Sequence, residues 1–138
     1  MAFAGINYIA VFLAGIASFI FGAVWYMTLS KLWMHATGLT ADEIRGEHGR
    51  LDRSPFLISL SGELFLALML AGLIGHIGPV TIVNSLASAF FVWSSFTLVP
   101  LAINHRYQLL PWSLTFIDAG HWLGVMMLQG LIIGAFGV

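Results

Sequence analysis

The stretch FLISLSGELFLALMLAGLIGHI, residues 56–77, decides the fold class because it stays apolar over the length of a membrane span. An α-helix rises about 1.5 Å per residue, so about 20 apolar residues cross the hydrocarbon core of a bilayer. Three further apolar runs of similar length surround it, at residues 6–29, 81–103 and 112–138. We therefore expect an all-α integral membrane protein, a single four-helix transmembrane domain over residues 1–138.

The composition agrees with a protein that is solvated by lipid. Of 138 residues, 59% are hydrophobic and 8% are charged, whereas a soluble domain carries about 25% charged residues. The lipid bilayer is therefore the first expected partner. Nucleic acid is not an expected partner, because five Lys and Arg residues and a net charge of -1 leave no basic patch. The chain has no cysteine, which excludes disulfides and thiolate metal sites.

The charges predict the orientation of the helices. Every Lys and Arg falls in the connections at residues 30–55 and 104–111, which lie on one side of a four-helix arrangement. The positive-inside rule then places these connections in the cytoplasm and both termini outside it. Within the first connection, LTADEI resembles a capping box with Thr40 as N-cap and Glu43 reaching back. This pattern predicts a short cytoplasmic surface helix after Thr40.

The end of the first hydrophobic run carries a family resemblance. The stretch FIFGAVWYMTLSKLWMHATGLT, residues 19–40, resembles the start of the small bacterial four-helix membrane proteins of the domain of unknown function family numbered 1761. The resemblance implies a four-helix plan over the whole chain and a multi-pass location in the bacterial inner membrane. It implies no catalytic residue and leaves the cofactor unknown. The positions that match the family hallmarks are Gly22, Trp25, Tyr26, Trp33, Gly38, Leu39 and Thr40.

Ionisable residues inside the apolar runs are the candidates for a functional site, since they are rare in membrane helices. Counted from the cytoplasmic ends of their helices, Asp118 lies roughly 9 Å deep, Glu63 roughly 10 Å and His121 roughly 13–14 Å. Gln129 shares a helix face with Asp118 and His121, and Thr97 on the third helix falls near the same depth. The sequence thus predicts a buried polar cluster of these five residues.

This cluster has two interpretations. Each group alone in hydrocarbon would cost several kcal/mol, so convergence at one depth favours a shared site such as a proton relay, a ligand-headgroup site or a metal site. Alternatively, the cluster only fixes helix packing, or Glu63 extends to the interface. Two carboxylates and one His are a thin ligand set, so no metal is expected. A bis-histidine haem is not expected either, because no two of the five histidines are level on facing helices.

Glycines on the last helix predict close helix packing. Gly120, Gly124, Gly130 and Gly134 form two Gly-x-x-x-Gly pairs opposite the polar face. The first helix carries a matching stripe of small residues, Ala14, Ser18 and Gly22. Either the glycine face packs on that stripe within one chain, or it is left for another subunit, which gives a homo-oligomer or a larger complex.

Three functions remain open at this point. The leading interpretation is a small non-enzymatic inner-membrane protein that self-assembles or serves as an accessory subunit of a larger membrane complex. The second is a proton-coupled transporter or channel component that uses Glu63, Asp118 and His121, although no helix is expected to be interrupted at its middle. The third is a small membrane enzyme that acts on a lipid, quinone or isoprenoid, with His121 as acid or base. The chain lacks the common hydrolase, phosphate-loop and zinc-protease motifs.

Overall fold

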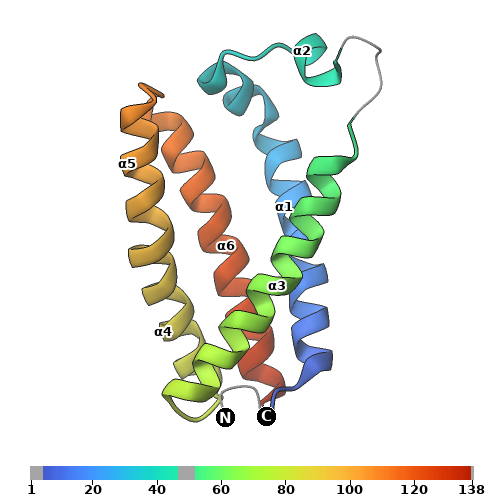
Figure 1. Ribbon diagram of the computed structural model, residues 1–138, viewed down its shortest axis with the longest axis vertical. Coiled ribbons are helices and arrows are strands. Elements are labelled where there is room, and N and C mark those ends of the chain that lie inside the picture. The colour runs from blue at the N-terminus through green and yellow to red at the C-terminus, as the bar shows by residue number, and fades with distance from the viewer. Residues whose placement is uncertain (1–4, 47–51, 138) are drawn as a thin grey trace.

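A computed structural model describes residues 5–46 and 52–137. The described residues contain helices and no strand, which confirms the all-α prediction. Four helical segments are long and apolar enough to cross a membrane (Figure 1). They are α1 (Tyr8–Thr37), α3 (Ser54–Ile77), the continuous segment Ile82–Tyr107, and α6 (Trp112–Phe136).

Both ends of α1 follow from local sequence. The Asn7 side chain accepts a hydrogen bond from the Ala10 amide at 3.1 Å and so caps the first turn. The helix continues past residue 29, its expected end, because neither glycine nor proline occurs between residue 29 and Gly38. Gly38 has a φ of 75°, and its amide donates to the Met34 carbonyl at 2.9 Å. This left-handed position is one that glycine occupies at little cost.

The short helix α2 (Ala41–Arg45) begins with the capping box that the sequence predicts. The Glu43 amide donates to the Thr40 hydroxyl at 3.3 Å, and the Glu43 carboxylate accepts from the Thr40 amide at 2.7 Å. These reciprocal bonds satisfy two backbone donors at the helix start. The helix lies near the end of the bundle where α1 finishes and α3 begins (Figure 1). Its predicted position on a cytoplasmic surface remains a prediction.

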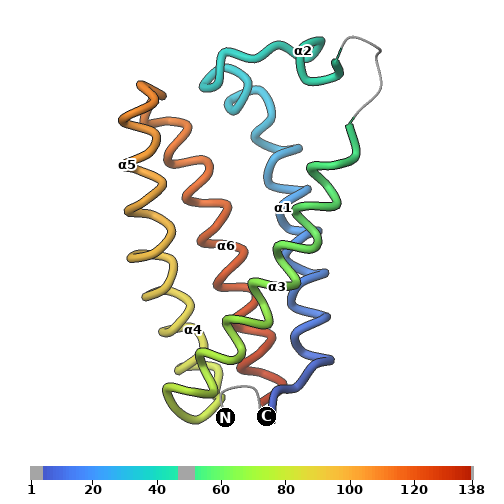
Figure 2. Tube along the Cα trace, in the orientation of Figure 1, coloured from blue at the N-terminus to red at the C-terminus, as the bar shows by residue number. Residues whose placement is uncertain are grey.

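Helix α6 runs through the middle of the bundle (Figures 1 and 2). It contacts α1 on one side and the segment Ile82–Tyr107 on the other, while α3 packs mainly on α1. The core is built on small side chains, since Ala14, Ala67 and Ala89 are completely buried. Small residues allow helix backbones to approach closely where lipid supplies no hydrophobic drive for association. The segment Ile82–Tyr107 is packed on one side only, and large side chains such as Phe91 and Phe96 are exposed.

The third membrane segment is not a regular α-helix, contrary to the expectation of four uninterrupted helices. It divides into α4 (Ile82–Val92), a π-helical turn η1 (Trp93–Leu98) and α5 (Val99–Tyr107). Pro100 accounts for the wider turn, because proline has no amide hydrogen to bond to the carbonyl four residues before it. The Trp93 indole, on this turn, donates to the Ala119 carbonyl of α6 at 2.9 Å. The irregular turn therefore fixes this segment against the central helix.

The glycines of α6 contact two different helices of the same chain. A Cβ built on Gly120 would lie 2.9 Å from the Trp25 ring, and one on Gly124 would overlap the Phe21 ring, both on α1. The glycine face therefore meets aromatic rings of α1 instead of the small stripe that the sequence suggested. Large rings fill this contact because the missing glycine side chains leave room for them.

The second glycine pair packs on the start of α4. A Cβ on Gly130 would lie 2.9 Å from the Ser85 carbonyl oxygen, and one on Gly134 would lie 2.7 Å from the Ile82 Cα. These neighbours are backbone atoms, so glycine is required for the approach of α6 to α4. Both glycine pairs are thus covered within the chain, and they no longer argue for a second subunit.

Candidate functional site

Glu63 and Gln129 form the deepest polar contact between helices. The Gln129 amide nitrogen, on α6, donates to the Glu63 backbone carbonyl at 3.0 Å and to the Ser18 hydroxyl at 2.9 Å. Gln129 and Ser18 are completely buried, and the Glu63 side chain points inward with 3% of its surface exposed. Among the described residues, the Glu63 Oε2 atom has no hydrogen-bond partner. The amide of Gln129 holds α3 through the Glu63 backbone and leaves the Glu63 Oε2 unpaired among the described residues.

His121 lies near Glu63, and both side chains approach Gly22. The Cβ position of Gly22 would be 2.7 Å from the His121 Nε2 and 3.7 Å from the Glu63 Oε1. The imidazole is held by aromatic rings, with ring centroids 4.8 Å from Tyr26 and 4.9 Å from Trp122. Its Nδ1 atom is buried without a hydrogen-bond partner in the described part of the chain. Gly22, a hallmark of the family resemblance, therefore makes the space in which these two groups meet.

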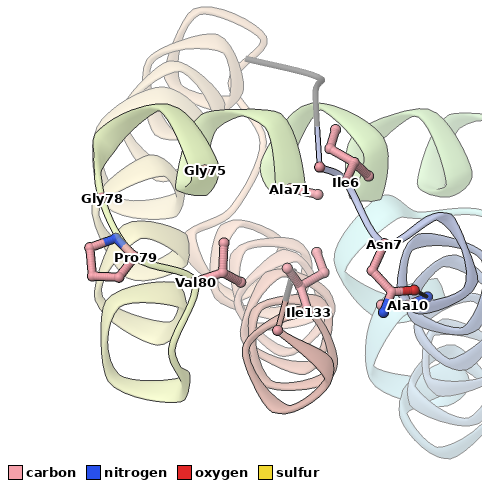
Figure 3. Close-up of a pocket in the computed structure, with 11 residues that line it drawn as sticks. Ile6, Asn7, Ala10, Ala71, Gly75, Gly78, Pro79, Val80 and Ile133 are labelled. Atoms are coloured by element: carbon pink, nitrogen blue, oxygen red, sulfur yellow. Dashed lines mark hydrogen bonds between the residues drawn. The ribbon is translucent and has the colours of Figure 1, made fainter. Parts of the chain in front are cut away.

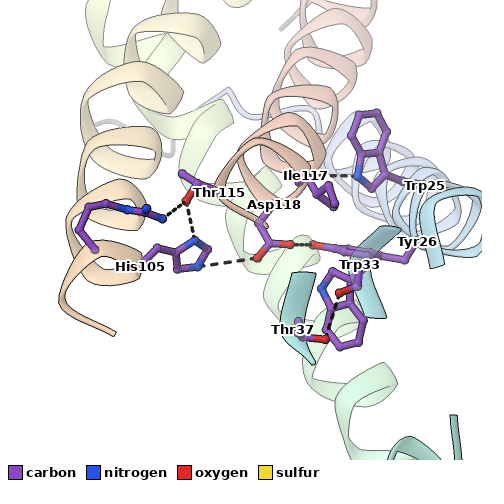
Figure 4. Close-up of polar contacts among 9 residues, drawn as sticks. Trp25, Tyr26, Trp33, Thr37, His105, Thr115, Ile117 and Asp118 are labelled. Atoms are coloured by element: carbon purple, nitrogen blue, oxygen red, sulfur yellow. Dashed lines mark hydrogen bonds and ion pairs between the residues drawn. The ribbon is translucent and has the colours of Figure 1, made fainter. Parts of the chain in front are cut away.

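Asp118 occupies a separate position, nearer the third membrane segment (Figure 4). Its Oδ1 accepts a hydrogen bond from the Tyr26 hydroxyl at 2.9 Å, and its Oδ2 lies 3.8 Å from the His105 Nε2. The side chains of Asp118 and His121 are about 60° apart around the helix axis, because they are three residues apart. This angle turns Asp118 toward α5 and His121 toward α1 and α3, with the Tyr26 ring between them.

The structure divides the predicted polar cluster into two groups and leaves one member out. Glu63, His121 and Gln129 gather near α1 and α3, while Asp118 binds Tyr26 and faces His105. Thr97 is half-buried in η1, and within residues 5–46 and 52–137 no side-chain hydrogen bond joins it to the other four. Similar depth on different helices did not bring Thr97 to the site, because depth says nothing about rotation around the axis.

His105 is a buried member of the Asp118 group and was not among the five residues of the predicted cluster (Figure 4). Its Nδ1 lies 3.0 Å from the Thr115 hydroxyl, which also accepts a bond from the Arg106 Nη2 at 3.1 Å. The Arg106 guanidinium sits 4.0 Å from the centre of the Trp112 ring. The turn between α5 and α6 is short, so it brings His105, just before the turn, next to Thr115 in the first turn of α6. That spacing was a signal in the sequence that could have identified His105.

Two tryptophans hold the segment around Asp118 in place. The Trp25 indole donates to the Ile117 carbonyl at 3.1 Å, and the Trp93 indole donates to the Ala119 carbonyl at 2.9 Å (Figure 4 shows the first). These bonds come from α1 and η1, on different sides of α6. Together they fix the rotation of α6, and with it the directions of Asp118 and His121. Trp25, a second family hallmark, therefore has a positioning role.

A cavity of about 640 Å³ lies between α1, α3 and α6, and it is the place where Glu63 and His121 meet open space. The other described residues that line it are apolar or aromatic except for two serines. Ile44 of α2 borders it at the end of the bundle near α2 (Figure 1). The lining residues are Phe19, Gly22, Ala23, Tyr26, Met27, Ser30, Ile44, Phe56, Ser59, Glu63, His121 and Trp122.

Two other cavities offer less chemistry. A groove of about 560 Å³ lies between α3 and the segment formed by α4 and η1, and a pocket of about 130 Å³ lies near the chain termini (Figure 3). Neither has an ionisable side chain among its described lining residues. No group of three metal-ligating side chains gathers in the described ranges. The cavity with Glu63 and His121 is therefore the candidate functional site.

Comparison with known proteins gives one match. The family model described as "Protein of unknown function (DUF1761)" matches residues 9–134, nearly the whole chain. Searches of curated proteins and of solved structures find no match.

Proposed function

We propose that this chain, a multi-pass membrane protein that belongs to the family "Protein of unknown function (DUF1761)", binds one amphipathic molecule in the cavity between α1, α3 and α6. The polar head of the molecule would bind Glu63 and His121. Its apolar part would lie against the aromatic and aliphatic wall. The proposed role is binding without catalysis, as expected of an accessory protein of the inner membrane.

The observation that carries the proposal is that Glu63 and His121, which line the cavity, each hold a polar atom without a hydrogen-bond partner among the described residues. The Glu63 Oε2 and the His121 Nδ1 are buried and lack hydrogen-bond partners among the described residues. Leaving such a group unsatisfied costs about 1–3 kcal/mol, and more for a charged group. A ligand head group that bonds to both atoms would recover this cost. Small-molecule sites have this character, with a largely apolar pocket of about 300–1,000 Å³ and a few placed polar groups.

The position of the cavity favours entry from one leaflet. Ser30, Ile44 and Phe56 border the cavity and lie in or next to the connection that holds most of the Lys and Arg residues. By the positive-inside rule this end faces the cytoplasm. We therefore propose that the ligand enters from the cytoplasmic leaflet, between α1 and α3.

Quenching of tryptophan fluorescence tests the proposal, because Trp122 lines the cavity. The protein in lipid nanodiscs is titrated with dodecanol that carries two bromine atoms close to its hydroxyl group, since bromine quenches indoles at contact and the Trp122 ring lies 4.9 Å from the His121 ring. We expect saturable quenching that disappears in Trp122→Phe. In His121→Leu the apparent affinity should fall about tenfold, because this variant loses a hydrogen-bonding group worth about 1.5 kcal/mol. Asp42→Asn, on the exposed helix α2, is the control that should leave the titration unchanged. Quenching that only follows partition into the lipid would refute the proposal.

A proton-coupled role is the second candidate, and a separate observation favours it. Polar contacts run from Thr115 through His105 to Asp118 and then to the Tyr26 hydroxyl, with distances of 3.0, 3.8 and 2.9 Å. The Tyr26 ring in turn lies 4.8 Å from the His121 ring. This series of polar contacts would carry protons from the end of α5 to the cavity.

Vesicles that contain the protein and an internal pH dye test this second candidate. An imposed potassium-diffusion potential should acidify wild-type vesicles faster than protein-free vesicles. Asp118→Asn should abolish the difference and Asp42→Asn should retain it. Equal rates for wild-type and protein-free vesicles would remove this candidate without affecting ligand binding.

A further inference from the structure

We propose that the ligand of the cavity is a lipophilic organic cation, with a protonated or quaternary amine next to the Glu63 carboxylate and an apolar tail along α1 and α3. This inference rests on the proposed binding function and names the charge of the head group. It comes from three features of the cavity wall: its charge, its aromatic rings and its volume.

The charge of the wall is one-sided. Among the described residues, Glu63 is the only acidic one that lines the cavity, and neither Lys nor Arg lines it. In the described part of the chain the one ion pair within the membrane helices joins His105 to Asp118, and none includes Glu63. A buried carboxylate without a positive partner is costly in a membrane, and a cation beside it lowers that cost. An anionic head group would raise the cost further and is therefore disfavoured.

Among the described lining residues, His121 is the one that could supply the missing charge from within the chain. Its imidazole forms no hydrogen bond or ion pair with Glu63 among the described residues, although both lie within 4 Å of the same point beside Gly22. It is instead buried, with 5% of its surface exposed, and a buried charge without a hydrogen-bonded partner is costly. A neutral His121 accepts or donates one hydrogen bond to the ligand and leaves the counter-charge to be brought by the ligand.

The aromatic content of the wall suits a cation. Phe19, Tyr26, Phe56 and Trp122 all line the same cavity as Glu63. The face of an aromatic ring attracts a cation, and rings around a carboxylate are a recurrent way to bind quaternary ammonium groups. An alcohol or a quinone would gain from the apolar surface but not from this attraction. The volume of about 640 Å³ accommodates a cation with a tail of drug-like size.

Three probes with one tail and different heads test the charge. Dodecyltrimethylammonium, dodecanol and dodecanoate, each with two bromine atoms on chain carbons close to the head group, are titrated against Trp122 fluorescence in nanodiscs of zwitterionic lipid. Each apparent affinity is corrected for partition into nanodiscs without protein. We expect the wild type to bind the ammonium probe at least about tenfold more tightly than the alcohol, and the carboxylate least tightly.

Two variants locate the origin of the preference. Glu63→Gln should remove the preference for the ammonium probe and change the affinity for the alcohol less than about twofold. Asp42→Asn, which also removes one negative charge, should keep the preference because Asp42 is exposed on α2. Phe56→Leu keeps every charge and changes a half-exposed ring at the cavity border. It should lower the affinity for the ammonium probe about two- to fivefold and leave the affinity for the alcohol unchanged. This variant covers the case in which Glu63→Gln does not fold.

The outcomes separate this inference from the proposed function. Equal wild-type affinities for the ammonium and alcohol probes would overturn the cation inference while leaving amphiphile binding intact. A preference that persists in Glu63→Gln would overturn it as well, since the charge would then act elsewhere. Saturable quenching by none of the three probes would overturn both.

Discussion

Gly134 offers a direct test of how the central helix is held. The structure places Gly134 of α6 against the first turn of α4, where a Cβ would lie 2.7 Å from the Ile82 Cα and 2.8 Å from the Thr81 carbonyl oxygen. Gly62 of α3 is a matched control, because a Cβ there would meet no atom within 4 Å among the described residues. We therefore compare Gly134→Ala with Gly62→Ala.

The magnitude follows from these distances. Carbon atoms at contact are about 3.5–4.0 Å apart, so the distance between the new methyl group and its neighbours would have to increase by roughly 1 Å. The neighbours at Gly134 are backbone atoms that cannot rotate away, so α6 and α4 must separate. Overpacking of this kind costs about 1–3 kcal/mol. The gain of up to about 1 kcal/mol from replacing glycine by alanine inside a helix is common to both variants and cancels in the comparison.

Reversible unfolding in mixed micelles measures the effect. The protein in a mild detergent is titrated with sodium dodecyl sulfate while helix content is followed by circular dichroism. We expect the free energy of unfolding of Gly134→Ala to be lower than that of Gly62→Ala by about 1–3 kcal/mol. Equal values for the two variants would refute the packing of α6 on α4.

The same variants bear on assembly. Because the structure covers Gly134 with a helix of its own chain, Gly134→Ala should leave the oligomeric state in nanodiscs unchanged. Weaker assembly at unchanged stability would show that the glycine face meets another subunit, the alternative that the sequence left open.

Two further predictions concern the first connection and the orientation. The Glu43 carboxylate accepts hydrogen bonds from the Thr40 backbone amide and from the Thr40 hydroxyl, which hold its pKa below the usual value near 4.3. This contribution to α2 is complete above that usual pKa and disappears as the pH falls through the lowered value, so the protection of the α2 amides, relative to their intrinsic exchange rates, should fall in acid; Thr40→Ala should flatten this pH dependence, and an unchanged profile would contradict the capping role. Single cysteines at Ala41 and Gln108 should resist an impermeant thiol reagent added outside intact cells, whereas one at Pro79 should react; the reverse pattern would place both termini in the cytoplasm.

The sequence alone determined the class of this protein and the course of its chain. Four apolar runs predict four spans because the length of a helix and the thickness of a bilayer are fixed quantities. The capping box at Thr40 was readable because its bonds join residues three positions apart. The family resemblance at residues 19–40 was likewise local, and the match over residues 9–134 shows the family. Each of these features depends on neighbours along the chain.

Only the tertiary structure decided which polar groups meet. Rise along a helix gives the depth of Asp118, His121 and Glu63 but not the rotation of α6, which two tryptophan indoles on other helices fix. That rotation brings His121 to Glu63 and turns Asp118 toward His105, a residue outside the predicted cluster.

The partners of the small residues were also decided by the packing of the whole bundle. A glycine pattern predicts close approach but does not name the neighbour, so Gly124 met the Phe21 ring and Gly134 met the backbone of α4. The same limit hid the cavity, since its wall takes residues from α1, α2, α3 and α6 that no sequence period relates. Contacts between helices depend on rotation, tilt and the shapes of side chains on both surfaces, and these are settled together only when the helices pack.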